Sequence, residues 1–278
     1  MNVFFLMLAV TTCYTITSLS DKYAIAEAKF SGNEFSFLMC ASMSVFIALC
    51  LPFQEIRFVL SWQAFAAILL IASCKMLEFQ MSALVLKQLS AFELKAWLGI
   101  TLFASYLTDI FYGADPRVSK FACILVTVLG LVFIAKSAKA GDADYRKIVL
   151  PLILYLVSKY GYGLVIKAFS PYISSTMQLL PALILIALIL APKATPRQLL
   201  QKNSRGVWFV VLARIPNAAG MLLENVIISI SLANYSFIQP MILVTLFFIG
   251  LIRKEPRSRL NLIGSLLCVA GVLAFQLL

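Results

Sequence analysis

The stretch "LEFQMSALVLKQLSAFEL" (77–94) places acidic residues within an apolar segment, and "LENVIISISLANYSFIQP" (223–240) repeats its pattern in the second half of the chain. Aligned without gaps, Glu78 lies over Glu224 and Ser90 lies over Ser236. A charge at the same position of two apolar segments predicts an internal repeat. The two stretches therefore suggest that the chain consists of two related halves.

The composition indicates that the solvent of this chain is lipid. Of its 278 residues, 62% are hydrophobic and 13% are charged, whereas an ordinary soluble domain has about 25% charged residues. The mean hydropathy is +0.96. The first apolar segment has no basic n-region and no convincing small-residue cleavage site, so we expect a retained helix instead of a signal peptide.

Ten apolar segments approach the length of about 20 residues that a bilayer-spanning helix needs. We expect helices at 2–26, 34–54, 62–85, 89–112, 117–136, 147–168, 172–191, 206–230, 235–252 and 259–277. The longest polar linker, 136–147, leaves five helices on each side. The predicted fold is an all-α integral membrane protein, with one five-helix repeat at 1–138 and another at 139–278.

Further matches occur in the same order along both halves, with Gly130 over Gly271 after a five-residue change in length and Pro52 over Pro192. Because each repeat has an odd number of helices, the second copy must cross the membrane in the opposite direction. Inverted repeats with a binding site between them are the construction of many secondary transporters. The sequence thus predicts ten transmembrane helices in two inverted repeats.

The last two predicted helices carry a pattern of proline, acid and glycine. In "SLANYSFIQPMILVTLFFIGLIRKEPRSRLNLIGSLLCVAGVLAF" (231–275), Pro240 is early in the first helix, Glu255 follows that helix, and Gly264 and Gly271 lie in the second. In this pattern the chain resembles the EamA-like ten-helix branch of the drug/metabolite transporter (DMT) superfamily.

The resemblance is weaker in the first half, which has Leu94 where that family usually has proline and lacks its early Trp-Gly pair. Members of the family carry amino acids, choline, nucleotide sugars or phosphorylated metabolites. The resemblance therefore implies a small-metabolite transporter, often an exporter, in the bacterial cytoplasmic (inner) membrane.

The residue types that are missing argue against an enzyme. The 278 residues include no histidine, which a Ser-His hydrolase, an HExxH metalloprotease and a His-ligated haem all require. The "GDAD" at 141–144 lies in a predicted loop, outside any helix that could hold an intramembrane aspartyl protease site. The six cysteines show no CxxC spacing, so we expect neither disulfides nor a zinc site. No enzyme, cofactor or metal is predicted.

Charged residues deep in the predicted helices are the candidate site, because each costs about 2.5–3.5 kcal/mol at a helix centre on insertion scales unless it faces protein or water. Lys75 and Glu78 are three residues apart and share a helix face. They could form a structural pair within the helix packing. Alternatively they line a polar cavity, with Glu78 as a proton or cation site and Lys75 as the partner of an anionic solute group.

Other deep charges have no evident partner on their own helices. Lys159 has no acidic residue on its helix, and Arg214 and Glu224 lie ten residues apart, about 15 Å along one helix. Asp109 is close to a helix end, where a capping role competes with a functional one. The candidate substrate-binding or coupling residues are Lys75, Glu78, Lys159, Tyr160, Tyr162, Arg214 and Glu224.

The predicted function is alternating-access transport of a small polar metabolite bearing a carboxylate or phosphate, with protons as a coupling ion. The alternatives are a flippase for a lipid or lipid-linked sugar, an exporter of cationic drugs, and a sensor without transport. The expected partners are a small-molecule substrate and membrane lipid, and the oligomeric state, monomer or homodimer, stays open. The net charge of +11 lies mostly between the apolar segments, where it indicates membrane topology and not nucleic-acid binding.

The basic residues predict the orientation in the membrane. Four lie in the even-numbered connections between helices, and fifteen lie in the odd-numbered ones. The four are Arg57, Arg117, Lys120 and Lys167; the fifteen are Lys22, Lys29, Lys87, Lys136, Lys139, Arg146, Lys147, Lys193, Arg197, Lys202, Arg205, Arg253, Lys254, Arg257 and Arg259. Basic connections stay in the cytoplasm, so both termini should lie outside, although the related ten-helix transporters usually have cytoplasmic termini.

A reporter that is active only in the cytoplasm tests this orientation. Fused to the C-terminus it should be inactive, and inserted into the 138–144 linker it should be active. Activity at the C-terminus would contradict the charge rule for this chain.

Overall fold

The computed structural model describes residues 3–28, 30–85, 88–89, 91–137, 145–196, 199, 204–252 and 258–278. The predicted roles of Lys87, Ser90, Glu255 and the "GDAD" at 141–144 fall outside these residues. The described part of the chain is all-α, apart from one isolated bridge between Phe58 and Ile173.

All ten predicted spans are helical. The helices are α1 (Val3–Ala28), α2 (Gly32–Cys50), the short 3₁₀ helix η1 (Leu51–Phe53), α3 (Trp62–Val85), α4 (Ala91–Trp97), α5 (Gly99–Phe111), α6 (Val118–Ser137), α7 (Tyr145–Phe169), α8 (Ser175–Ala194), α10 (Ser204–Leu212), α11 (Arg214–Ile230), α12 (Leu232–Ile252) and α13 (Arg259–Leu277). Among the described residues, nine of these spans are long and apolar enough to cross a membrane. They identify an integral membrane protein.

Two predicted spans are each interrupted. The span 206–230 breaks at Ala213, between α10 and α11. Pro216 explains the break, because it has no N–H to donate to the carbonyl of Leu212 and its ring crowds that carbonyl. The span 89–112 breaks at Leu98, where the backbone N–H and the hydroxyl of Thr101 both donate to the Leu98 carbonyl. The break leaves α5 only 13 residues long.

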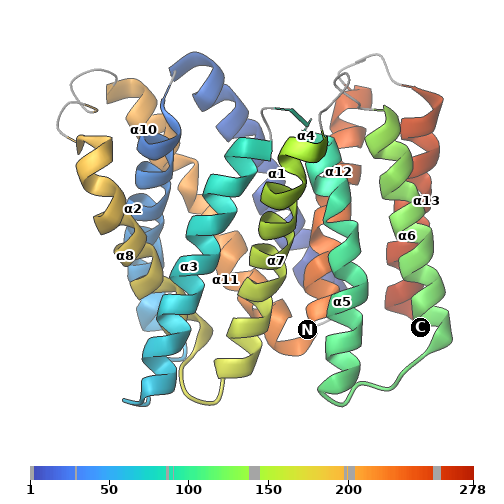
Figure 1. The fold of residues 1–278 in the computed structure, drawn as a ribbon, viewed down its shortest axis with the longest axis horizontal. Coiled ribbons are helices and arrows are strands. Elements are labelled where there is room, and N and C mark those ends of the chain that lie inside the picture. Colours follow the sequence, from blue (N-terminus) through green and yellow to red (C-terminus); the bar gives the residue numbers. More distant parts are fainter. Residues whose placement is uncertain are drawn as a thin grey trace.

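The bundle is assembled by pairing helices from different halves of the chain. Helix α6 packs against α13, α3 against α7, α2 against α8, α1 against α11, and α5 against α12. Both termini lie toward the same end of the bundle (Figure 1), as an even number of spans requires. We call this end the termini end; it also holds the α2–α3, α5–α6, α7–α8 and α11–α12 connections. Large apolar side chains such as Leu69 and Leu188 are exposed on the outside, as expected of helices that face lipid.

Helices α6 and α13 cross where both have glycine. A Cβ on Gly130 would lie 2.5 Å from the carbonyl oxygen of Gly264, and a Cβ on Gly264 would lie 2.5 Å from that of Gly130. Backbone atoms cannot move aside as a flexible side chain can, so only glycine permits this approach. Gly271 is likewise held against Thr127.

Replacing either glycine of this crossing should push the two helices apart. We expect Gly130→Ala and Gly264→Ala each to destabilise the protein by about 1–3 kcal/mol, measured as a lower melting temperature of the purified protein. Gly32→Ala is the matched control, since a Cβ there meets nothing within 4 Å. If Gly130→Ala melts like this control, the helices do not touch at these glycines.

Candidate functional site

A small cavity of about 100 Å³ lies inside the bundle, where helices of both halves meet. Its walls come from α1, α2, α3, α7, α8 and α11. The side chains that line it are Tyr14, Met39, Cys40, Met43, Lys75, Glu78, Phe79, Lys159, Leu183, Asn217, Met221 and Glu224. We call it the central cavity. Four predicted charges, two basic and two acidic, lie around it.

Glu78 bridges two ammonium groups in the central cavity. Its Oε2 accepts a hydrogen bond from Lys75 Nζ at 3.0 Å, and its Oε1 lies 2.7 Å from Lys159 Nζ. Each of the three side chains is at most 15% exposed. Lys75 and Glu78 therefore pair with each other and also line a cavity, whereas their predicted roles toward a proton or a solute stay predictions. Lys159, with no partner on its own helix, finds one on α3.

Glu224 is held differently from Glu78. It is only 2% exposed, and its Oε2 accepts a hydrogen bond from the hydroxyl of Tyr14 on α1. Among the ion pairs of the described residues, none includes Glu224. The two acids that the sequence alignment superimposes thus have different environments, one paired with two lysines and one held by a phenol.

Two tyrosines support the cluster from the side of α7 and α12. Tyr162 is fully buried, and its ring centroid lies 4.0 Å from Lys75 Nζ, which is a cation–π contact. Its hydroxyl donates to Asn225 Oδ1 at 2.8 Å. The hydroxyl of Tyr235 donates to the carbonyl of Lys159 at 3.2 Å. These contacts fix the backbone of α7 and the ring beneath Lys75.

The cavity therefore separates two charges of opposite sign. Lys75 and Lys159 share the single carboxylate of Glu78, which leaves one excess positive charge on that side. Glu224 supplies a carboxylate on α11 for which no basic partner lies within ion-pair distance in the described part of the chain. Such a site can hold a solute that has an acidic group at one end and a basic group at the other.

Three predicted site residues do not line the central cavity: Tyr162, which contacts Lys75, and Arg214 and Tyr160, which lie apart from it. Arg214 is fully buried and forms an ion pair with Asp21, so it joins α11 to α1. Its Nε also donates to the carbonyl of Val210 at 3.3 Å. Tyr160 faces α5, where its hydroxyl shares a 2.5 Å hydrogen bond with Thr108 Oγ1. Arg214 and Tyr160 are therefore not among the residues around the central cavity, and their predicted roles in binding or coupling stay predictions.

The sequence analysis misses Tyr14, Asn217 and Asn225, which contact the cluster or line the cavity. Asn217 and Asn225 are polar residues on the same helix as Glu224, and Asn217 lies two turns before it, on the same face. That periodicity could have identified Asn217. Tyr14 offers no such signal, because its role depends on α1 packing against α11.

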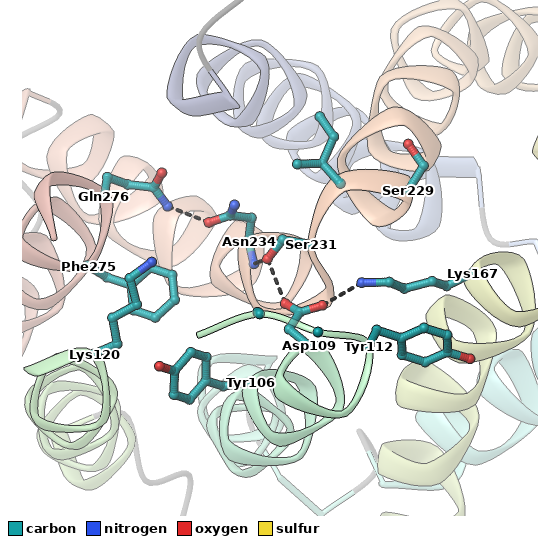
Figure 2. A pocket seen from close by; sticks show the side chains of 13 residues that line it. Tyr106, Asp109, Tyr112, Lys120, Lys167, Ser229, Ser231, Asn234, Phe275 and Gln276 are labelled. Carbon is teal, nitrogen blue, oxygen red and sulfur yellow. Dashed lines mark hydrogen bonds and ion pairs between the residues drawn. The ribbon is translucent and has the colours of Figure 1, made fainter. Parts of the chain in front are cut away.

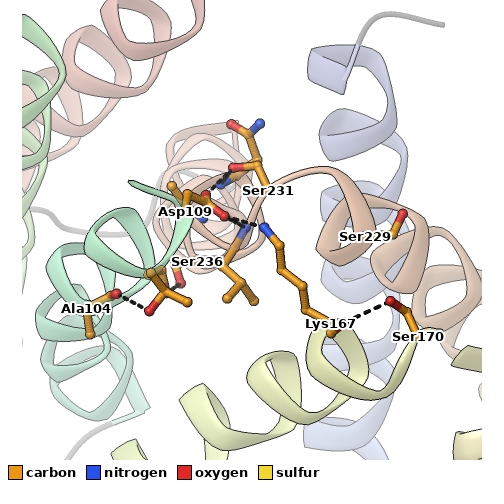
Figure 3. Close-up of polar contacts among 12 residues, drawn as sticks. Ala104, Asp109, Lys167, Ser170, Ser229, Ser231 and Ser236 are labelled. Carbon is orange, nitrogen blue, oxygen red and sulfur yellow. Dashed lines mark hydrogen bonds and ion pairs between the residues drawn. The ribbon is translucent and has the colours of Figure 1, made fainter. Parts of the chain in front are cut away.

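A second polar cluster lies in a pocket of about 510 Å³ at the termini end (Figure 2). At its centre the carboxylate of Asp109 accepts hydrogen bonds from the backbone N–H groups of Leu232 and Ala233, both at 2.9 Å, and from Ser231 Oγ at 2.7 Å. Lys167 Nζ lies 2.6 Å from the same carboxylate (Figure 3).

Asp109 therefore does cap a helix, but the helix is α12 and not its own. A carboxylate at the first N–H groups of a helix satisfies donors that have no partner within the helix and interacts favourably with the helix dipole. The cap and the ion pair join α5, α7 and α12 at the termini end. We assign Asp109 and Lys167 to structure, since their polar groups are already occupied by each other and by α12.

No protein-family model matches this chain, and no curated protein sequence matches it. The comparisons therefore assign the chain to no family, and the candidate site stands on its own geometry.

The bridging position of Glu78 predicts how three substitutions rank in their effect on the free energy of unfolding. Glu78→Gln leaves two buried ammonium groups without a carboxylate, so we expect a loss on the order of 3–5 kcal/mol in the free energy of unfolding. Lys159→Met should be less harmful, because Glu78 keeps Lys75. Glu224→Gln should change stability by less than about 1 kcal/mol, because its amide oxygen can still accept from Tyr14.

Melting temperatures of the three purified variants check this order. If Glu78→Gln melts at the same temperature as Glu224→Gln, Glu78 does not bridge the two lysines in the folded protein.

Proposed function

We propose that this protein is a secondary transporter that moves a small zwitterionic or carboxylate-bearing metabolite across the membrane by alternating access. The observation that carries the proposal is the central cavity, a charged site enclosed midway along the helices, where both halves of the chain contribute. Charged groups are costly within a membrane, so those that line a cavity usually mark a solute or ion pathway.

We propose further that the two halves are inverted repeats. Under a two-fold rotation that exchanges the halves, the third span (α3) takes the place of the eighth (α10 and α11). The sixth span (α7) takes the place of the first (α1). Accordingly, the contact of α3 with α7 has its counterpart in that of α11 with α1, and the contact of α3 with α8 in that of α11 with α2. Both members of each pair are present, and this supports a two-fold relation with an axis in the membrane plane.

The family resemblance points the same way. An EamA-like member of the drug/metabolite transporter superfamily would have this number of spans and would carry a metabolite of this size. We place the protein in the bacterial cytoplasmic membrane on the same ground. From the distribution of basic residues, and against the habit of that family, we propose that the odd-numbered connections lie inside.

The charges around the cavity favour a zwitterion as the solute. Its carboxylate would bind at the excess positive charge of Lys75 and Lys159, and its ammonium would bind at Glu224. Charge-assisted hydrogen bonds of this kind are worth about 1.5–3 kcal/mol each. The cavity volume of about 100 Å³ fits a molecule of the size of a small amino acid.

Glu224 is also the acid best placed to carry a coupling proton. Glu78 is committed to two lysines, whereas the described contacts of Glu224 are with the neutral hydroxyl of Tyr14. A carboxylate without a counter-ion takes up a proton more readily than one between two ammonium groups. The coupling proton and the ammonium of the solute would then compete for the carboxylate of Glu224.

A lipid or lipid-linked sugar flippase is the second candidate. A groove of about 440 Å³ lies on the side of the bundle between α5 and α7, lined by Leu107, Thr108, Phe111 and Tyr160 among others. The acyl chain of a lipid could lie in this groove, at the side of the bundle. Tyr160 and Thr108 close it on the inside through their hydrogen bond, so it supports lipid contact less directly than the central cavity supports a small solute.

Transport into proteoliposomes tests the proposal. With a pool of small metabolites, the wild-type protein should accumulate a zwitterionic solute, and an imposed pH gradient should increase the accumulation. Glu224→Gln should lower transport by about tenfold or more, because it removes a charge-assisted contact and the proton site.

Asp115→Asn is the matched control, since Asp115 is an exposed acid in the connection between α5 and α6. It should transport like the wild type. If Glu224→Gln transports at the wild-type rate with and without the gradient, Glu224 is neither a solute site nor a coupling site. Transfer of labelled lipid without uptake of any small metabolite would support the flippase instead.

A further inference from the structure

A third pocket, of about 550 Å³, lies at the termini end between the α2–α3 connection, the α7–α8 connection and α11. It is lined mainly by hydroxyl and amide side chains. We call it the serine-rich vestibule and define it by Ser170, Ser174, Ser175, Thr176, Asn225 and Ser229. Its position is separate from the Asp109 cluster, although Ser229 borders both pockets.

The charged residues of the vestibule neutralise each other. Arg57 and Glu55 both line the pocket and form an ion pair with one another. Its other lining residues are uncharged. A pocket of hydroxyls and amides without net charge favours a polar solute that also has no net charge, such as a zwitterion.

Two buried side chains lie between the vestibule and the central cavity. Asn225 lines the vestibule, whereas its neighbour Glu224 lines the cavity. Tyr162 connects the two spaces, because its ring lies against the ammonium of Lys75 and its hydroxyl donates to Asn225. Tyr162 is 0% exposed and Asn225 is 1% exposed. Their hydrogen bond therefore lies between the cavity and the vestibule.

Asn225 has an unused donor. Its Oδ1 accepts from Tyr162, but its buried Nδ2 has no hydrogen-bond partner among the described residues. A buried N–H group without a partner is unfavourable by about 1–3 kcal/mol, so native proteins rarely keep one without a reason. A carboxylate or carbonyl oxygen of a solute in the vestibule would satisfy it.

We propose that the serine-rich vestibule is a second binding station for the zwitterionic solute, and that the hydrogen bond between Tyr162 and Asn225 is the gate between this station and the central cavity. This inference rests on the proposed transport function. Rotation of Tyr162 breaks its bond to Asn225 and its contact with Lys75 in the same movement. Opening of the gate is thereby linked to release of Lys75, one of the groups that would bind the solute's carboxylate.

The native thiol of Cys40 allows a test, because Cys40 lines the central cavity and is fully buried. The other five cysteines (Cys13, Cys50, Cys74, Cys123 and Cys268) are replaced by alanine, and the protein is reconstituted into vesicles in one orientation. Sulfonatoethyl methanethiosulfonate, which does not cross bilayers, is added from the termini side. The rate at which Cys40 is modified then reports how often the gate is open.

Tyr162→Phe keeps the ring and removes only the hydroxyl that donates to Asn225. We expect Cys40 to be modified about tenfold faster, the factor that loss of one buried hydrogen bond gives. Asn225→Ala removes the acceptor of the same bond and should have the same effect. It tests the gate independently if Tyr162→Phe folds poorly. In the double variant, Cys40 should be modified about as fast as in either single variant, since both substitutions remove the same hydrogen bond. Tyr106→Phe is the matched control and should leave the rate unchanged, because that buried hydroxyl contacts the backbone of Arg117 in the α5–α6 connection and not the gate.

The possible results test the gate, the second binding station and the transport function separately. If Tyr162→Phe and Asn225→Ala both label at the wild-type rate, the gate is refuted, and transport by the wild type still stands. Pooled neutral amino acids should slow labelling in Tyr162→Phe, and no slowing would refute the station. If labelling follows the prediction but the wild type carries no solute in the transport assay, the transport function fails and the gate does not.

Discussion

The arrangement depends on one carboxylate shared by two ammonium groups inside a bundle that faces lipid. In a low-dielectric interior, an isolated ammonium is strongly unfavourable, and a carboxylate within hydrogen-bond distance offsets that penalty only if the geometry is good. Glu78 contacts Lys75 and Lys159 at 3.0 Å and 2.7 Å. Since the two lysines come from different halves of the chain, this single acid holds α3 against α7 at the depth where the cavity lies.

The same principle explains the other buried charges. Arg214 pairs with Asp21 between α11 and α1, and Lys167 pairs with Asp109 between α7 and α5. Each pair joins helices that are distant in sequence, and the surrounding helix contacts are apolar or depend on glycine. Glu224, whose described contact is with a neutral hydroxyl, is the exception. A buried acid that has no direct ion pair is the kind of group on which a solute or a proton can act.

The sequence predicts the helices well because the bilayer imposes their length and their apolar composition. It places the interrupted spans less well, since breaks such as the one before Arg214 arise from a single proline whose effect depends on whether neighbours accommodate it. For Asp109 the sequence leaves capping and function open, and the structure shows a cap on a helix that begins more than a hundred residues later in the chain. For Lys159, the sequence shows that its own helix holds no acidic partner, but it does not identify the acid on another helix that pairs with it.

What the sequence determines by itself is the membrane environment, the helical segments and the presence of charged residues deep within them. These properties follow from local composition and periodicity. Only the tertiary structure decides which charges meet: Lys159 joins Glu78, Arg214 leaves the site to join Asp21, and Tyr14 reaches Glu224. The physical reason is that an ion pair depends on distances of a few ångströms between helices, and those distances are set by helix packing, which no single segment encodes.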